Sequence, residues 1–140
     1  MKRALAVLLI ALVAIGAATY VAGEQTEVVV VRTFDDKGVP WETKVWAVDH
    51  DGDVWVRVAN PQRHWYRRLL ASPRAELVRA GRVRPVWAEP SEDPAVRAAI
   101  DASFREKYGL VDWWYGVLLR RNPIPVRLRS ADTPSPARAD

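Results

Sequence analysis

The first change in the hydrophobic pattern comes near the amino terminus. Lys2 and Arg3 precede a run of nineteen uncharged, mostly apolar residues, Ala4 to Ala22. This length is close to the roughly 20 residues that cross a bilayer and exceeds the signal-peptide core of about 7–15 residues. We therefore predict a membrane anchor over residues 1–23, with a cleaved signal peptide as the alternative. Basic residues stay on the cytoplasmic side, so the domain is expected outside the cell membrane, or secreted if the segment is cleaved.

From residue 27 the pattern becomes that of β-strands. The β-branched run Val28–Val31, the turn residues Asp35–Gly38 and the run Val39–Asp49 predict a hairpin. Asp49–Asp53 contains Asp-Gly, which marks a tight turn, and the valines of Val54–Val58 then alternate with other residues. The acidic turn lacks the length and the closing glutamate of a calcium loop, so no metal site is predicted there.

The segment from His64 to Pro73 follows a helical period and has two unlike faces. Its apolar arc is predicted to be buried as a plug of the fold and consists of Trp65, Tyr66, Leu69 and Leu70. Its basic arc is predicted to face water or an anion and consists of Arg63, His64, Arg67 and Arg68. Asn60-Pro61 is expected to start this helix, about three turns before Ser72-Pro73 ends it.

The remaining pattern adds a hairpin, a longer helix and a last strand. Runs 75–80 and 82–88 flank Gly81, and Asp93-Pro94 opens a helix that ends at Gly109. The helix is predicted to bury a stripe at four-residue steps, namely Val96, Ile100, Phe104 and Tyr108. Its charged face is expected only to stabilise the helix and carries Arg97, Asp101 and Arg105.

The aromatic segment 112–119 allows two interpretations, a short helix that packs on the core or a lid over a ligand. Alternation over 124–128 predicts the closing strand, and residues 130–140 have the composition of a disordered tail. The predicted fold is therefore mainly β with α: a small antiparallel barrel of about six strands with two or three helices, spanning residues 24–129.

Charge is concentrated in one window. Residues 57–84 contain eight arginines and one acidic residue, a balance of 8 − 1 = +7, within a chain of net charge +4. Such a window favours an anionic partner. A domain outside the cell is not expected to meet nucleic acid, and the two histidines show no hydrolytic constellation. The chain has no cysteine, which excludes disulfides and thiolate metal sites.

One stretch resembles a known superfamily. The string W-Y-R-R-L-L-A-S-P, residues 65–73, followed by Ala75-Glu76-Leu77, is similar to the W-Y-x-N-L-x-A-N-P-x-V-x-L segment of split β-barrel flavin- and deazaflavin-binding proteins. These include pyridoxamine-phosphate-oxidase-like proteins and deazaflavin-dependent nitroreductases. The strand 53–58 also resembles the third strand of that superfamily. The resemblance implies a split barrel, often a homodimer, here in a membrane-anchored branch.

The resemblance also implies a cofactor, FMN or a deazaflavin, that lies along the barrel with its phosphate held by basic residues. The positions that match its binding surface are Lys44, Trp46, Arg57, Asn60, Arg63, Arg67 and Arg68. Lys44 and Trp46 would flank the ring system. Helix amides and arginine forks are good phosphate ligands, which supports the remaining positions on physical grounds.

Two functions remain open from the sequence. The first is a flavin- or deazaflavin-dependent oxidoreductase-like protein of unknown substrate, in which the cofactor supplies the redox chemistry. The second is a cofactor-free binding or structural domain at the outer face of the membrane, whose basic surface contacts anionic lipid or a partner. The sequence assigns no catalytic residue.

Overall fold

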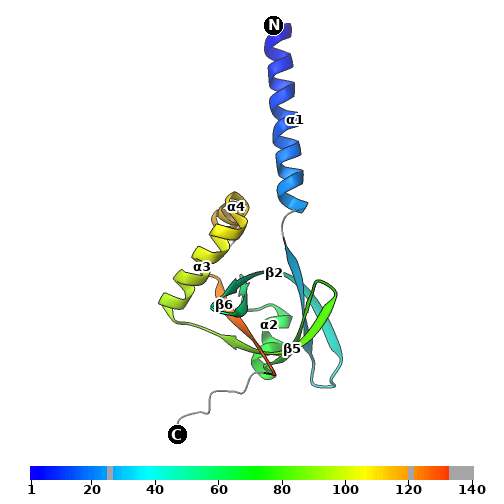
Figure 1. Cartoon of the computed structure of the whole chain (residues 1–140), viewed down its shortest axis with the longest axis vertical. Coiled ribbons are helices and arrows are strands. Elements are labelled where there is room, and N and C mark those ends of the chain that lie inside the picture. Colours follow the sequence, from blue (N-terminus) through cyan, green and yellow to red (C-terminus); the bar gives the residue numbers. More distant parts are fainter. Residues whose placement is uncertain (25–26, 120–121, 133–140) are drawn as a thin grey trace.

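The computed structural model describes residues 1–24, 27–119 and 122–132. Helix α1 (Lys2–Glu24) extends away from the rest of the molecule (Figure 1). None of the helices in these described ranges is both long enough and apolar enough to cross a membrane. The apolar amino-terminal run is therefore helical, but the predicted transmembrane span is unsupported. The predicted tail from residue 133 onward lies outside the described residues.

Six antiparallel strands close into a barrel in the order β1-β2-β3-β6-β5-β4. Their bounds are β1 Val28–Phe34, β2 Pro40–His50, β3 Asp53–Val58, β4 Arg74–Arg79, β5 Arg82–Pro90 and β6 Ile124–Ser130. Closure leaves no edge strand unpaired, which strands of this length require for stability in water. The predicted six-stranded antiparallel barrel with helices is confirmed.

Turn chemistry positions the first three strands. Asp51 and Gly52 both have positive φ, 50° and 81°, which is the backbone that a two-residue hairpin loop requires. In the preceding turn, Asp35 Oδ1 accepts hydrogen bonds from the backbone amides of Lys37 and Val39, each at 2.9 Å. Pro40 is the first residue of β2, a position that tolerates the missing amide proton.

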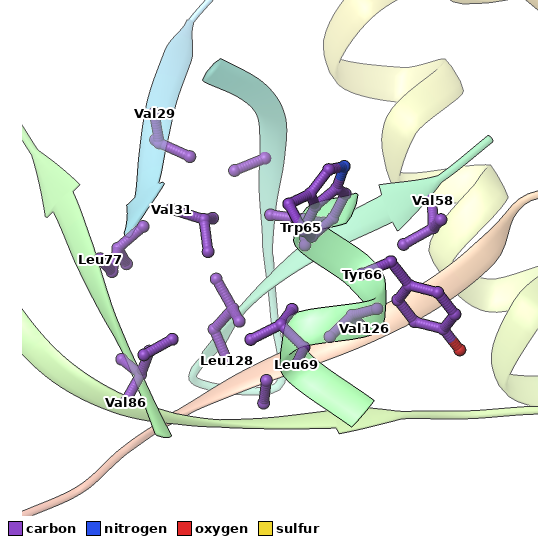
Figure 2. Close-up of a cluster of buried hydrophobic side chains, with 14 residues drawn as sticks. Val29, Val31, Val58, Trp65, Tyr66, Leu69, Leu77, Val86, Val126 and Leu128 are labelled. Carbon is purple, nitrogen blue, oxygen red and sulfur yellow. The ribbon is translucent and has the colours of Figure 1, made fainter. Parts of the chain in front are cut away.

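The core of the barrel consists of residues at every second strand position, whose side chains point inward. Figure 2 shows α2 (His64–Ala71) directing Trp65 and Leu69 toward Val31 and Val126. The cluster also contains Tyr66, so three of the four predicted plug residues are buried. Leu70 is 59% exposed, contrary to the prediction. It lies 100° beyond Leu69 around the helix, outside the arc that faces the barrel.

Helix α2 begins later than the sequence indicated. Asn60 Oδ1 accepts a hydrogen bond from the amide of Gln62 at 2.9 Å, and the Asn60 carbonyl accepts one from the amide of Arg63. These bonds close a turn in which Pro61 follows Asn60, an arrangement that competes with helix formation. The helix starts only at His64 and has eight residues, or about two turns.

Helix α3 (Pro94–Tyr108) covers the outside of the barrel wall beside β2 and β6 (Figure 1). The Asp93 side chain accepts from the Ala95 amide at 2.8 Å, and Gly109 ends the helix with φ 54°. A second apolar cluster under it comprises Val48, Trp55, Ile100, Phe104 and Tyr108, so the predicted stripe is confirmed. Burial of side chains such as Ile100 and Phe104 contributes about 1.5–3 kcal/mol each. Helix α4 (Leu110–Leu119) follows directly.

Candidate functional site

A cavity of about 310 Å³ lies between α3, α4 and the outer face of β3. This volume is at the lower end of the roughly 300–1,000 Å³ that small-molecule sites occupy. The polar and aromatic side chains that line it are Arg57, Arg97, Asp101, Arg105, Asp112 and Trp113, and Asn122 and Pro123 complete one side. Only Arg57 of these residues was predicted as a site residue.

Arg57 forms the base of this pocket. Val56 and Val58 point into the barrel, so strand alternation directs Arg57 outward, where its side chain is only 6% exposed. Its Nη1 donates to Asp101 Oδ1 at 3.0 Å and its Nη2 donates to Asp112 Oδ1. The guanidinium also lies 3.8 Å from the centre of the Phe104 ring. One arginine of the barrel wall therefore holds both α3 and α4.

The pocket contains more hydrogen-bond donors than its own residues satisfy. The Nε atoms of Arg57 and Arg97 are buried and have no hydrogen-bond partner in the described part of the chain. An unsatisfied buried donor costs about 1–3 kcal/mol. Three arginines face two carboxylates, so the formal charge of the lining is 3 − 2 = +1. An anion in the cavity would improve this charge balance.

Two further predicted residues lie on β2. Trp46 is half-buried and stacks on Tyr108 of α3, with ring centroids 5.2 Å apart and an interplanar angle of 21°. Lys44, two residues earlier on the same face of the strand, is exposed. Tyr108 of α3 therefore covers one face of the Trp46 ring.

The predicted residues around α2 occupy a different place. Arg63 and Arg67 are exposed, and Asn60 belongs to the turn before the helix. Arg68 Nε donates to Thr33 Oγ1 at 2.8 Å, and its guanidinium lies 5.3 Å from the ring centre of Trp41. Arg57 therefore belongs to the pocket beside α3 and α4, whereas Arg68 contacts residues of β1 and β2.

Arg79 and Arg82, which also belong to the basic window, lie at the other end of the barrel. Strand β4 runs from Arg74, next to α2, to Arg79, a distance of roughly 17 Å at 3.3 Å per residue. There Arg79 donates two hydrogen bonds to Asp49, at 2.7 and 2.8 Å, and also pairs with Glu27. Hydrogen bonds to these two carboxylates raise the pKa of Arg79. The +7 window is therefore distributed over three places in the fold.

A second cavity, of about 600 Å³, lies on the outer face of β1, β2 and β4. Arg32 stands at its centre between Glu42, at 2.8 Å, and Glu76. Hydrogen bonds with these two carboxylates raise the pKa of Arg32. Because two acidic residues surround one cation, this cavity has the wrong charge for an anionic ligand.

Sequence reasoning missed the four other charged residues of the pocket. Arg97, Asp101 and Arg105 were interpreted as a charged face that stabilises the helix, and Asp112 as part of an aromatic segment. Their association with Arg57 could not be derived from local spacing, because Asp101 and Asp112 are 44 and 55 residues away from it. The available signal was a charged stripe next to the apolar stripe of α3. Trp113, which core packing would bury, is 56% exposed.

The sequence of residues 18–120 matches a family described as "Uncharacterized protein conserved in bacteria (DUF2255)". The chain belongs to this family. No curated protein sequence matches the chain. The family extends through β1 to β5 and α2 to α4, and so it includes Arg57, Asp101 and Asp112 of the pocket.

Several solved structures share the fold. HutZ, a heme storage protein from Vibrio cholerae, is 14% identical, with a TM-score of 0.61 over 81% of this chain and 88% of that one. An F420-H2 dependent reductase is 18% identical, with a TM-score of 0.57 over 71% of this chain and 92% of that one. A heme binding protein from Mycobacterium smegmatis is 18% identical, with a TM-score of 0.58 over 78% of this chain and 48% of that one. At such identities the similarity shows a shared split-barrel fold.

Proposed function

We propose that the protein binds a flavin or a deazaflavin as a redox cofactor and holds the anionic part of the cofactor in the pocket of Arg57, Arg97 and Arg105. The observation that carries this proposal is the excess of positive charge in a cavity of ligand size, where Arg97 and Arg105 have no ion pair in the described part of the chain. The fold supports it, because an F420-H2 dependent reductase has the same architecture. Fold alone does not determine function, so the pocket chemistry is the stronger argument.

The residues of the pocket divide into three roles. Arg97 and Arg105 have no ion pair in the described part of the chain, so their guanidiniums can bind a phosphate. Arg57 is fixed by Asp101 and Asp112 and maintains the shape of the base of the pocket. Trp113 provides an exposed aromatic surface against which a planar ring can stack. The cofactor supplies the electron transfer, and the protein binds and orients it.

The test is a titration of the purified full chain with FMN and with deazaflavin F420, followed by tryptophan fluorescence and by the absorbance of the ring system. We expect quenching and a spectral shift with one of these compounds. Riboflavin, which lacks the phosphate, should bind at least about tenfold more weakly than FMN, because a charge-assisted hydrogen bond contributes about 1.5–3 kcal/mol. No spectral change with either compound up to high micromolar concentration would contradict the proposal, as would a clear preference for heme.

A second candidate is a cofactor-free domain that binds an anionic lipid or partner at the outer face of the membrane. The observation that favours it is that Arg57 is already neutralised, whereas Arg63 and Arg67 are exposed and have no ion pair within the described residues. Each such arginine would contribute about 1 kcal/mol near an anionic surface.

Vesicle sedimentation separates the two candidates. Under the second candidate, the full chain binds vesicles that contain anionic lipid better than neutral vesicles, and the double variant Arg63→Gln/Arg67→Gln loses the difference. The control is Arg82→Gln/Arg84→Gln, which removes the same charge from the hairpin at the other end of the barrel. Equal binding to both kinds of vesicle by the wild-type chain excludes the lipid-binding form of this function.

A further inference from the structure

Helix α3 lines the pocket with two basic hydrogen-bond donors and one acidic acceptor between them in the sequence. Arg97, Asp101 and Arg105 follow one another at four-residue spacing and all line the cavity. Such residues share one helix face, and each step corresponds to about 6 Å along the helix axis. Asp101 therefore lies about one turn from Arg97 and one turn from Arg105 on this face.

Asp101 retains the capacity to accept a hydrogen bond. Its Oδ1 accepts from Arg57 Nη1 at 3.0 Å, and its Oδ2 has no hydrogen bond within the described part of the chain. The side chain is 29% exposed, so Oδ2 can be reached by a ligand. An ionised carboxylate only accepts hydrogen bonds, and it repels an anion. A bare anion in this cavity would gain from the arginines but would be opposed by Asp101.

We infer that the pocket selects an organic phosphate that carries a hydroxyl group close to its phosphate, a polyol or sugar phosphate. The phosphate binds the guanidinium of Arg97, which lines the cavity and has no ion pair in the described part of the chain. The hydroxyl group donates a hydrogen bond to Asp101 Oδ2. Arg105 binds the phosphate at the exposed side of the pocket. This inference rests on the proposed function only in placing the anionic part of a ligand in the same cavity.

The dimensions of the site agree with this class of ligand. A cavity of about 310 Å³ is too small to enclose a whole dinucleotide and is open to solvent at the exposed Trp113. A phosphate on Arg97 and a hydroxyl group near Asp101 would be separated by about one helical turn, or roughly 5–6 Å. Two or three carbon atoms between the phosphate and the hydroxyl group span such a distance.

The experiment uses three compounds without a redox ring: ribose 5-phosphate, inorganic phosphate and ribose. Binding to the full chain is measured by isothermal titration calorimetry. We expect ribose 5-phosphate to bind at least about tenfold more tightly than inorganic phosphate, since a hydrogen bond to a charged group contributes about 1.5–3 kcal/mol. Ribose should bind more weakly than both. Equal affinities for ribose 5-phosphate and inorganic phosphate would overturn the inference.

The variant Asp101→Asn makes the test sharper. Removal of one negative charge should strengthen the binding of inorganic phosphate, and it should reduce the advantage of ribose 5-phosphate over inorganic phosphate. If Asp101 acted only through its charge, the variant would bind both compounds more tightly by the same factor, which would contradict the inference. If this variant does not fold, Arg97→Gln is compared instead, and it should weaken the binding of ribose 5-phosphate by about tenfold or more. Unchanged affinity in that variant would also contradict the inference.

These outcomes are independent of the proposed redox function. If ribose 5-phosphate binds with the expected preference while FMN and deazaflavin F420 do not bind, the flavin proposal fails and the polyol phosphate site stands. If FMN binds but the preference for ribose 5-phosphate over inorganic phosphate is missing, the cofactor is held by another group and the inference fails.

Discussion

Two charged clusters border helix α3, and they differ in how completely their charges are paired. The hairpin-end cluster comprises Glu27, Asp49, Arg79 and Lys107, and its two basic residues are both paired with carboxylates. In the pocket cluster only Arg57 is paired with its two carboxylates, whereas Arg97 and Arg105 have no ion pair in the described ranges. The first cluster joins elements of the fold, and the second surrounds a cavity.

The difference separates a structural role from a binding role. In the hairpin-end cluster, Lys107 also donates to the Ala47 carbonyl at 2.8 Å, which links α3 to β2 and to the residue preceding β1. Its cations therefore have little to offer a ligand. The pocket combines a fixed arginine with unpaired ones, so its structural part can remain intact when an anion binds.

The largest predicted effect concerns Arg57. Replacement Arg57→Leu would remove the guanidinium that Asp101 and Asp112 share, and Asp112 has a side chain only 10% exposed. Removal of one partner of a buried pair typically costs about 3–5 kcal/mol, and we expect a loss of this size in urea unfolding. Arg57→Lys keeps the positive charge but not the forked guanidinium, and it should lose less stability. Wild-type stability of Arg57→Leu would show that the ion pairs do not hold α3 and α4.

A smaller effect is expected at Tyr108. Its hydroxyl group donates to the Ala47 carbonyl at 2.6 Å and accepts from the Ala47 amide, while its ring stacks between Trp46 and Phe104. Tyr108→Phe keeps the stack and removes the bonds, which should lower the free energy of unfolding by about 1–2 kcal/mol. Thermal and urea unfolding measure this. A change in affinity for FMN without a change in stability would contradict the purely structural role of this cluster.

The smallest effect is predicted for Asp49, whose side chain is 61% exposed. Hydrogen bonds from Arg79 hold the pKa of Asp49 below its usual value despite the opposing effect of burial. A lowered pKa gives stability at neutral pH that is lost as the pH falls through that pKa. Asp49→Asn should therefore destabilise the protein by less than about 1 kcal/mol at pH 7.

The pH dependence provides the control for Asp49. The difference between wild type and Asp49→Asn should shrink as the pH falls below about 4, because the wild-type carboxyl group then becomes protonated, first in the unfolded chain and at still lower pH in the folded protein. Urea unfolding at several pH values measures this convergence. A difference that persists unchanged at low pH would assign the effect to packing rather than to the charge.

The barrel could be predicted from sequence because its signals are local. Alternating valines, the Asp51-Gly52 turn and the caps Asp93 and Gly109 each act within a few residues. The start of α2 was missed because Asn60 forms a turn with its own backbone neighbours instead of capping the helix. The exposure of Leu70 was missed because the arc of α2 that faces the barrel is narrower than the predicted apolar arc.

The pocket could be predicted only in part. Strand alternation placed Arg57 on the outer face, but its partners come from α3 and α4, which tertiary packing brings to it. The charge count of the basic window was also misleading. The window includes Arg74 and Arg79, which lie at opposite ends of β4. Of all the arginines in the window, only Arg57 lines the pocket. The sequence therefore indicated a larger basic surface than the fold forms, and it did not reveal the charged residues that α3 and α4 contribute to the pocket.

The affinity for FMN in two matched double variants tests most directly whether unpaired arginines of the pocket bind the ligand. Arg97→Gln/Arg105→Gln removes two charges from the pocket, and Arg82→Gln/Arg84→Gln removes two from the β4–β5 hairpin. Isothermal titration calorimetry should show FMN binding at least about tenfold weaker in the first variant, and unchanged in the second. Equal affinities in both variants and in the wild type would contradict the assignment of the pocket as the binding site.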